Sequence, residues 1–138
     1  AKIAAALDDG SALEAFRRGV VAQGGDVSAI DEDDGLPKAS DKEEYRSPEG
    51  GRFSFADCAA VGRAVSALGG GRRRLEDPID HSVGLVFKRR AGEPVEKGDA
   101  LCVIHHNGGR GLAEARSQLD SALCVAESAE VEPLILDA

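Results

Sequence analysis

The sequence predicts a domain of the α+β class. Residues 58–68 and 112–126 place apolar side chains three and four positions apart, the spacing of an amphipathic helix. Between them, residues 83–87 and 100–105 are short apolar runs that favour buried strands, and the glycines of residues 92–98 indicate a turn region joining them. The order of elements is helices first and then a mixed unit of helices and strands, so the sequence predicts the α+β class.

Length and composition predict a single core of small side chains. The 138 residues are 42% hydrophobic but only 4% aromatic, with no Trp and many Ala. A chain of this length buries enough surface to fold without disulfides or metal. Short aliphatic side chains let helices approach closely, so we expect tightly packed helices and modest burial per residue.

The charge pattern excludes some classes of partner. A formal net charge of -8 disfavours nucleic acid, because phosphate backbones select basic surfaces. No apolar run reaches the ~18 residues of a membrane span, and no segment resembles a signal peptide. We therefore expect a soluble cytoplasmic protein with neither nucleic acid nor a membrane among its partners.

The amino-terminal part predicts two consecutive helices. Residues 1–8 are Ala-rich and apolar, and Gly10 can close a helix in the left-handed conformation. Ser11 and Glu14 have the spacing of a capping box at the start of the second helix, which residues 23–25 end. One face of that helix carries Leu13, Phe16 and Val20.

Residues 26–44 form an acidic stretch that divides the chain. Residues 31–34 are all acidic, and nothing nearby fixes the geometry of metal ligands, so a solvated loop is favoured over a metal site. We expect residues 1–44 to be a helical segment with an acidic connecting loop. Residues 45–138 then form the α+β domain.

Local signals define the remaining elements of this domain. Residues 45–47 and 52–55 flank a Pro and Gly turn and predict a short hairpin. Asp57 can cap the helix that follows it, and residues 69–71 end that helix in a glycine-rich loop. A final strand is expected at residues 131–136.

Four ordered motifs carry a resemblance to a known family. They are Ala22-Gln23-Gly24-Gly25-Asp26, the run from Leu68 to Gly84, the hairpin pattern from Gly92 to Leu101, and Ile104-His105. Together they resemble the carboxy-terminal domain of the pyrimidine nucleoside phosphorylases, thymidine phosphorylase included. The family typically shows Leu-Gly-Ala-Gly-Arg where this chain has Gly70 in place of Ala. The resemblance implies an α/β-hammerhead domain with a barrel-sandwich-like β unit and about three helices.

The resemblance also implies a reaction for the parent enzyme. Orthophosphate attacks the anomeric carbon of a pyrimidine nucleoside, so that thymidine and phosphate give thymine and 2-deoxyribose 1-phosphate. The family performs this step with a phosphate loop and base-holding residues that have no counterpart in this sequence. We therefore expect no catalytic, cofactor-binding or metal-binding residues here, and an isolated chain without activity. Its expected partners are the rest of the parent chain, orthophosphate, the nucleoside, and a second subunit in a homodimer.

The glycine and arginine loop is the candidate functional site. We predict a loop that closes over the cleft of the intact enzyme, with the members Gly70, Gly71, Arg72, Glu76 and Asp77. Successive glycine amides can form an anion-binding nest, and guanidiniums suit phosphate. The alternative is a helix cap whose arginines pair with Glu76, Asp77 and Asp80. We expect Asp77 and Asp80 to be turn and salt-bridge residues, because phosphorolysis needs no protein base.

Histidines and cysteines predict no site. His105 and His106 are adjacent, so in a strand their side chains point to opposite faces and cannot share a metal. Cys58, Cys102 and Cys124 are widely separated in apolar surroundings, which favours buried free thiols.

Two alternative interpretations of the chain stay open. The turn pattern of residues 92–101 also resembles lipoyl and biotinyl carrier domains, although Lys88 and Lys97 lack a carrier lysine's setting. The chain is then a non-catalytic binding module with a lipoyl-like fold. The archaeal-type AMP phosphorylases, which share the domain, are the other alternative.

Overall fold

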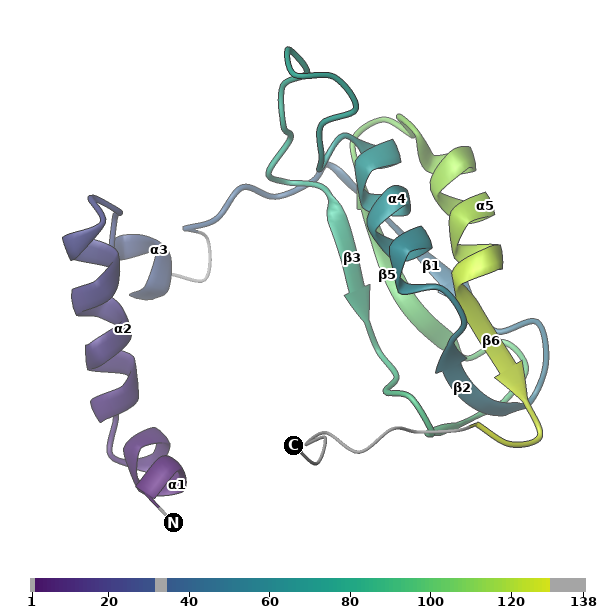
Figure 1. Ribbon diagram of the computed structural model, residues 1–138, viewed down its shortest axis with the longest axis horizontal. Coiled ribbons are helices and arrows are strands. Elements are labelled where there is room, and N and C mark those ends of the chain that lie inside the picture. The colour runs from purple at the N-terminus through teal and green to yellow at the C-terminus, as the bar shows by residue number, and fades with distance from the viewer. Residues whose placement is uncertain (1, 32–34, 130–138) are drawn as a thin grey trace. The chain divides into compact units, whose positions relative to one another are not determined.

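The computed structural model describes residues 2–31 and 35–129, which divide into two compact units. Residues 1–37 form the first unit and residues 38–138 the second (Figure 1). Each unit is described by itself. In the described residues, no helix is both long enough and apolar enough to cross a membrane.

In its described residues, the first unit contains three helices, α1 (Lys2–Asp8), α2 (Ser11–Ala22) and α3 (Ser28–Asp31). The first two confirm the sequence prediction. The capping box does not form, because Ser11 is already the first residue of α2 and its amide donates to Oδ1 of Asp9 at 2.8 Å. That hydrogen bond lowers the pKa of Asp9. The helix α3 lies in the segment predicted to be a loop.

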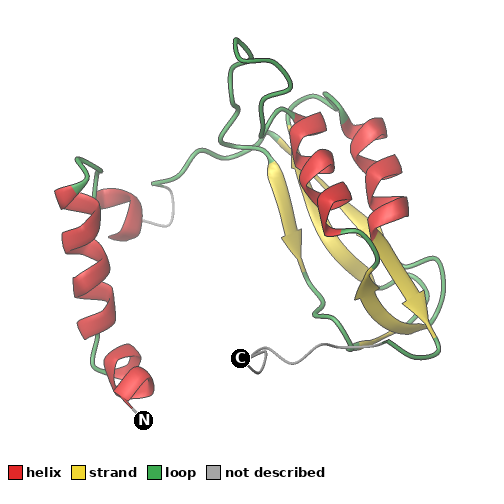
Figure 2. Ribbon diagram, in the orientation of Figure 1, coloured by secondary structure: helices red, strands yellow, loops and turns green. Residues whose placement is uncertain are grey.

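The second unit, as far as residue 129, contains two small antiparallel sheets and two helices (Figure 2). One sheet has the strand order β1 (Asp41–Arg46), β5 (Ala100–His106), β3 (Gly84–Phe87). The other has the order β4 (Pro94–Val95), β2 (Gly51–Phe55), β6 (Leu123–Ala126). The α+β prediction is confirmed. The described residues contain five helices rather than about three, since the first unit alone supplies three of them.

The predicted hairpin around residues 48–51 is wrong. Strand β1 pairs with β5, whereas β2 pairs with β4 and β6 in the other sheet. The buried Ser47 explains the crossing: its amide donates to the Asp99 carbonyl at 2.8 Å, and its carbonyl accepts from the Gly98 amide at 2.9 Å. This pairing holds the chain against the turn before β5, so residues 48–50 pass from one sheet to the other.

Helices α4 (Cys58–Leu68) and α5 (Leu112–Ala122) run side by side against the β1-β5-β3 sheet (Figure 1). Asp57 caps α4 as predicted, by accepting from the amides of Ala59 and Ala60. Helix α5 ends at Ala122, earlier than the predicted residue 126, because residues 123–126 pair with β2. The strand predicted at residues 131–136 lies outside the described residues.

The core confirms the prediction of small side chains and close helices. Between the two helices and the first sheet, the buried residues are Ala64, Ala67, Leu68, Cys102, Ile104, Ala115 and Leu119. Gly111 lies so close to α4 that a Cβ there would stand 1.9 Å from the carbonyl oxygen of Ala67. A smaller cluster combines Phe53 and Val95 of the second sheet with Leu101 of β5.

Candidate functional site

The predicted site lies on the loop of residues 69–83, which connects α4 to β3. Figure 1 shows this loop rising beyond the ends of both elements. It begins at Gly69, which adopts a φ of +101°, a conformation that a side chain disfavours. The Gly69 amide donates to the Ser66 carbonyl and the Gly70 amide to the Val65 carbonyl. Glycine therefore ends α4 here as predicted.

Gly70 and Gly71 pack so closely against the last turns of α4 that neither leaves room for a side chain. A Cβ on Gly70 would come within 2.8 Å of Cγ1 of Val65, and one on Gly71 within 2.6 Å of Oγ of Ser66. The amides of Gly69 and Gly70 are already used in capping the helix. The loop therefore does not offer the run of free glycine amides that an anion-binding nest needs.

Asp77 organises the backbone at the tip of the loop. Its Oδ2 accepts from the amide of Arg73 at 3.1 Å and from the amide of Arg74 at 2.8 Å. The Asp77 amide in turn donates to the Arg74 carbonyl. Asp77 thus holds a tight turn, which confirms the turn predicted for it, and its carboxylate forms no ion pair with a guanidinium in the described part of the chain.

The three arginines of the loop differ in what they contact. The guanidinium of Arg73 donates to the carboxylate of Glu114 in the first turn of α5, and this hydrogen bond raises the pKa of Arg73. The exposed side chains of Arg72 and Arg74 form no hydrogen bond or ion pair with any described residue. Glu76 is also exposed and unpaired within the described part of the chain. Two guanidiniums therefore remain available to bind an anion.

Asp80 holds the far end of the loop. Its Oδ1 accepts from the hydroxyl and the amide of Ser82, and its Oδ2 accepts from Nδ2 of Asn107 at 2.7 Å. The Ser82 hydroxyl is the main cause of the lowered pKa of Asp80, followed by the Ser82 amide and Asn107. The backbone amide of Asp80 donates to the carbonyl of Gly69 at 2.9 Å, and this hydrogen bond joins the two ends of the loop.

Sequence reasoning missed Glu114 and Asn107 as partners of this loop. Glu114 lies 41 positions from Arg73, and Asn107 lies 27 positions from Asp80. No local pattern marks them, although the glycines at positions 108, 109 and 111 indicate an irregular turn after Asn107. All three of those glycines have positive φ.

The adjacent histidines do not form a joint site. His106 is buried and its Nδ1 accepts from the Gly109 amide at 3.1 Å. His105 is partly exposed, and burial lowers its pKa with help from Lys42 and Lys88. Within the described residues, no three His, Cys, Asp or Glu side chains gather closely enough to hold a metal ion.

The three cysteines differ from one another in exposure. Cys102 is buried, which raises the pKa of its thiol to about 11. Cys124 is half-buried. Cys58 is exposed at the start of α4, so the prediction that all three are buried is wrong for this residue.

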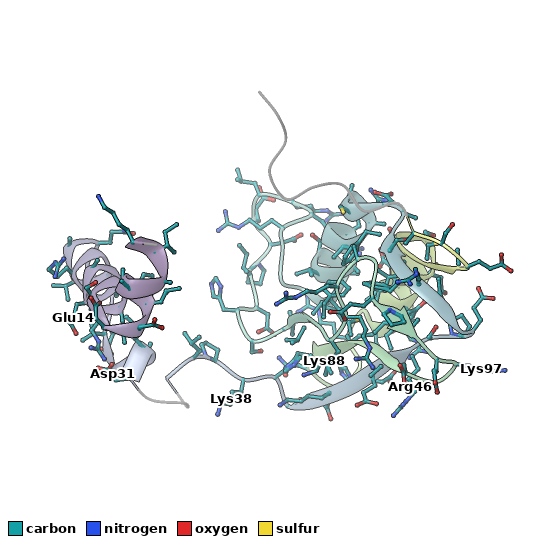
Figure 3. All side chains as sticks on the ribbon, turned by 90° about the horizontal axis from the view of Figure 1, so that it is seen from below. Glu14, Asp31, Lys38, Arg46, Lys88 and Lys97 are labelled. Carbon is teal, nitrogen blue, oxygen red and sulfur yellow. The ribbon has the colours of Figure 1, made fainter. Side chains whose placement is uncertain are left out.

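The lysines weighed for a carrier role lie on different parts of the second unit. Lys97 lies in the turn between β4 and β5 and points away from the domain, and Lys88 follows β3 (Figure 3). The turn at Lys97 is held by Asp99, whose Oδ2 accepts from the Glu96 amide at 3.2 Å and from Arg89 at 3.0 Å. The hydrogen bond from Glu96 is the main cause of the lowered pKa of Asp99.

Comparison with known proteins identifies similar sequences over most of the chain. The model of the pyrimidine nucleoside phosphorylase C-terminal domain matches residues 53–126. The pyrimidine-nucleoside phosphorylase of Staphylococcus haemolyticus is 36% identical over 94% of this chain and 30% of its own length. Its counterpart in Staphylococcus aureus strain RF122 is 36% identical over 88% of this chain and 28% of its own length. The pyrimidine-nucleoside phosphorylase of Geobacillus stearothermophilus is 42% identical over 74% of this chain and 24% of its own length. The matched region is therefore less than a third of each relative.

Proposed function

Because this chain belongs to the pyrimidine nucleoside phosphorylase C-terminal domain family, we propose that it is the carboxy-terminal part of a phosphorolytic pentosyltransferase. The parent reaction converts thymidine and orthophosphate into thymine and 2-deoxyribose 1-phosphate. The observation that carries this proposal is the family match over residues 53–126, which spans α4, the candidate loop and α5. The relatives named above support it, since each is called a pyrimidine-nucleoside phosphorylase.

The proposal divides the work between this chain and the rest of the intact enzyme. Phosphorolysis needs a bound phosphate, an oriented sugar and stabilisation of charge on the departing base. The described residues hold no cluster of groups suited to all three tasks, so the reacting residues belong to the upstream part of the enzyme. This domain forms one wall of the cleft, and the chain alone is inactive. We assign the intact enzyme to the cytoplasm as a homodimer.

The fold supports a wall of fixed shape. We assign the two antiparallel sheets to the barrel-sandwich-like β unit of a hammerhead domain. Tyr45, Phe87 and Leu123 each pack against both core clusters, so the two sheets share one interior. A rigid β unit of this kind anchors the two ends of the loop of residues 69–83.

We propose that the candidate loop is the part of this domain that faces the cleft. Its two ends are joined at Gly69 and Asp80, while Arg72 and Arg74 are exposed and have no partner among the described residues. Guanidiniums bind phosphate oxygens in a bidentate manner. We propose that the loop closes over the cleft and that Arg72 or Arg74 binds an anionic group of the substrate there, beside Gly70, Gly71, Glu76 and Asp77.

The parent reaction is tested by measuring base release. The protein extended through the coding sequence that precedes Ala1 is incubated with thymidine, uridine or AMP, with and without orthophosphate. We expect phosphate-dependent release of thymine or uracil by the extended protein and none by the 138-residue chain. Release of adenine from AMP alone would instead assign the parent to the archaeal-type nucleotide phosphorylases. A lipoyl or biotinyl adduct in the mass spectrum would assign the carrier function.

The loop is tested in the extended protein with Arg72→Ala. Loss of a group that binds the substrate raises KM or lowers kcat, and we expect kcat/KM to fall by about 10-fold, the effect of one charge-assisted hydrogen bond. The matched control is Arg90→Ala, which removes an exposed arginine from another loop. Unchanged kinetics in Arg72→Ala and in Arg74→Ala would remove the loop from the proposal.

A further inference from the structure

A pocket of about 320 Å³ opens in the second unit, beside the connection that leads from β1 to β2. Figure 1 shows this connection passing close to β6. Its lining combines the apolar side chains of Leu101, Leu123 and Val125 with the polar groups of Tyr45, Glu49 and Asp120. A pocket of this volume accommodates a small organic molecule. The loop of residues 69–83 contributes nothing to the lining, so this pocket is a second candidate site on the domain.

The pocket runs along the open edge of β6. Residues 123–125 all line it, and because consecutive side chains of a strand point to opposite faces, such a pocket lies at the edge of the strand. The other edge of β6 pairs with β2. Phe53 of β2 uses both its amide and its carbonyl to bond residues 92–93. Its partner Val125 therefore directs its own amide and carbonyl away from β2, and the Val125 carbonyl is an acceptor at the pocket.

Two carboxylates lie at the pocket, and no Lys, Arg or His among the described residues lines it. Oδ1 of Asp120 accepts from the Tyr45 hydroxyl at 2.6 Å, which leaves Oδ2 without a partner in the described part of the chain. Burial, and then this hydrogen bond, raises the pKa of the Tyr45 phenol, so the phenol stays a donor and fixes the carboxylate. Glu49 is exposed and forms no ion pair with any described residue. Arg116 lies over the Tyr45 ring but is engaged with Glu43.

We propose that this pocket binds a small amphipathic cation, which is an apolar body that carries one primary ammonium group. An ammonium group donates three hydrogen bonds. The pocket offers it three kinds of acceptor, namely the free oxygen of Asp120, the carboxylate of Glu49 and the carbonyl of Val125. The apolar body lies against Leu101 and Leu123. Both charges at the pocket are negative, which disfavours an anion. This binding site goes beyond the proposed function and does not depend on it.

Binding at this pocket should stabilise the second unit, because the lining comes from both sheets. Tyr45 and Leu101 belong to the β1-β5-β3 sheet, whereas Leu123 belongs to the β4-β2-β6 sheet. The pocket exists only in the folded domain. A ligand that binds the folded state alone raises the free energy of unfolding as its concentration rises.

The probe is 2-phenylethylamine, a phenyl body with one ammonium group. The matched controls are the neutral 2-phenylethanol and the anionic 3-phenylpropionate. Titration of the 138-residue chain, followed by amide NMR, should shift the signals of β6 with a Kd of about 1 mM, typical of a ligand of this size. We expect both controls to bind about 10-fold more weakly, because they lack the charge-assisted hydrogen bonds. Equal binding of the amine and the alcohol would overturn the proposal, as would unchanged β6 signals with the amine.

Cys124 lines the pocket and provides a second measurement. With the amine at roughly ten times its Kd, alkylation of Cys124 by iodoacetamide should slow about 10-fold by mass action. Cys58 is exposed at the start of α4 and does not line the pocket, so its rate should stay the same. An unchanged rate at Cys124, or equal slowing at Cys58, would count against the site. In the protein extended upstream of Ala1, a Cys124 that is already unreactive without the amine would show that polypeptide fills the pocket, which also overturns the proposal.

Two variants test the carboxylates. Glu49→Gln and Asp120→Asn each remove one negative charge and keep an acceptor oxygen, and each should weaken binding of the amine about 3- to 10-fold. The control Glu76→Gln removes an exposed carboxylate from the loop of residues 69–83 and should bind the amine as the unaltered chain does. Glu49 makes no bond through its carboxylate to a described residue, so Glu49→Gln decides if Asp120→Asn does not fold. Full affinity in Glu49→Gln and in every folded Asp120→Asn sample would overturn the proposal.

Discussion

Asn107 donates a hydrogen bond from Nδ2 to Oδ2 of Asp80 at 2.7 Å, which joins the end of the candidate loop to the turn after β5. The same nitrogen donates to Oγ of Ser82 at 2.9 Å, and Oδ1 of Asn107 accepts from the Ser40 amide at 2.7 Å. One side chain therefore connects three segments that are distant in the sequence. The position of the loop on the domain depends on it.

Replacing Asn107 with Ala should loosen the loop and destabilise the domain. The change removes two donated bonds and one accepted bond, and leaves Asp80 and the Ser40 amide to water. We expect the free energy of unfolding to fall by about 1–3 kcal/mol. Urea denaturation measures it, with Ser117→Ala on the exposed part of α5 as the control. A loss no larger than that of the control would contradict the role given to Asn107.

Gly111→Ala should be among the most damaging single changes in the chain. A Cβ at Gly111 would lie 1.9 Å from the carbonyl oxygen of Ala67, and φ is +67°. The two helices must separate to make room, so we expect a cost of about 3–5 kcal/mol. Gly108→Ala is the matched control: φ is +57° but the space is open, so only about 1 kcal/mol of backbone strain is expected. Equal thermal stabilities of the two variants would show that α4 and α5 are not in such close contact.

His105 should make the stability of the domain depend on pH. Burial lowers its pKa below the usual 6.5, and Lys42, directly opposite on β1, adds to the effect. The unfolded chain therefore binds the proton more readily than the folded one. The contribution of His105 to the free energy of unfolding should be complete above about pH 6.5. It should be lost as the pH falls through the lowered pKa of the folded state. Urea titrations at pH 7.5 and 5.5 test this, and His105→Gln should flatten the difference between them.

The control for that titration is His81→Gln, which removes a histidine from the exposed loop before β3. If His105→Gln retained the full difference, or lowered it no more than this control does, other groups would be its source.

The cysteines should react with a thiol reagent in the order of their exposure. Cys58 is exposed and should react first, and the half-buried Cys124 should follow more slowly. Cys102 is buried and the pKa of its thiol is about 11, so it should react only when the domain unfolds. Mass spectrometry after timed labelling identifies the modified residue. Early labelling of Cys102 would contradict the packing of β5 against the helices.

The sequence predicted the elements whose signals are local. Gly69 ends α4 and Asp57 begins it, and both depend on hydrogen bonds to residues a few positions away. The hairpin prediction failed because strand pairing is not local: β1 finds its partner about 60 positions further along, in β5. The charge and turn residues near the middle of residues 45–55 are equally compatible with a hairpin and with a crossing between sheets.

The candidate site shows the same limit. Glycine and arginine in residues 69–74 were enough to predict a capped helix end and an exposed cationic loop. Asp77 was predicted to be a turn and salt-bridge residue. The turn is confirmed, but the Asp77 carboxylate accepts from backbone amides instead of forming an ion pair with a described guanidinium. The partner of Arg73 is Glu114 on another helix, and only the packing of α4 against α5 brings that carboxylate within reach.

The most direct test of the central claim follows orthophosphate itself by phosphorus NMR. The protein extended upstream of Ala1 is mixed with thymidine and phosphate, and the 138-residue chain is mixed with the same substrates in parallel. We predict that the extended protein converts phosphate into a sugar 1-phosphate with an equal amount of free thymine, while the chain alone leaves the phosphate signal unchanged. Formation of sugar 1-phosphate by the chain alone, or its absence with the folded extended protein, would contradict the account.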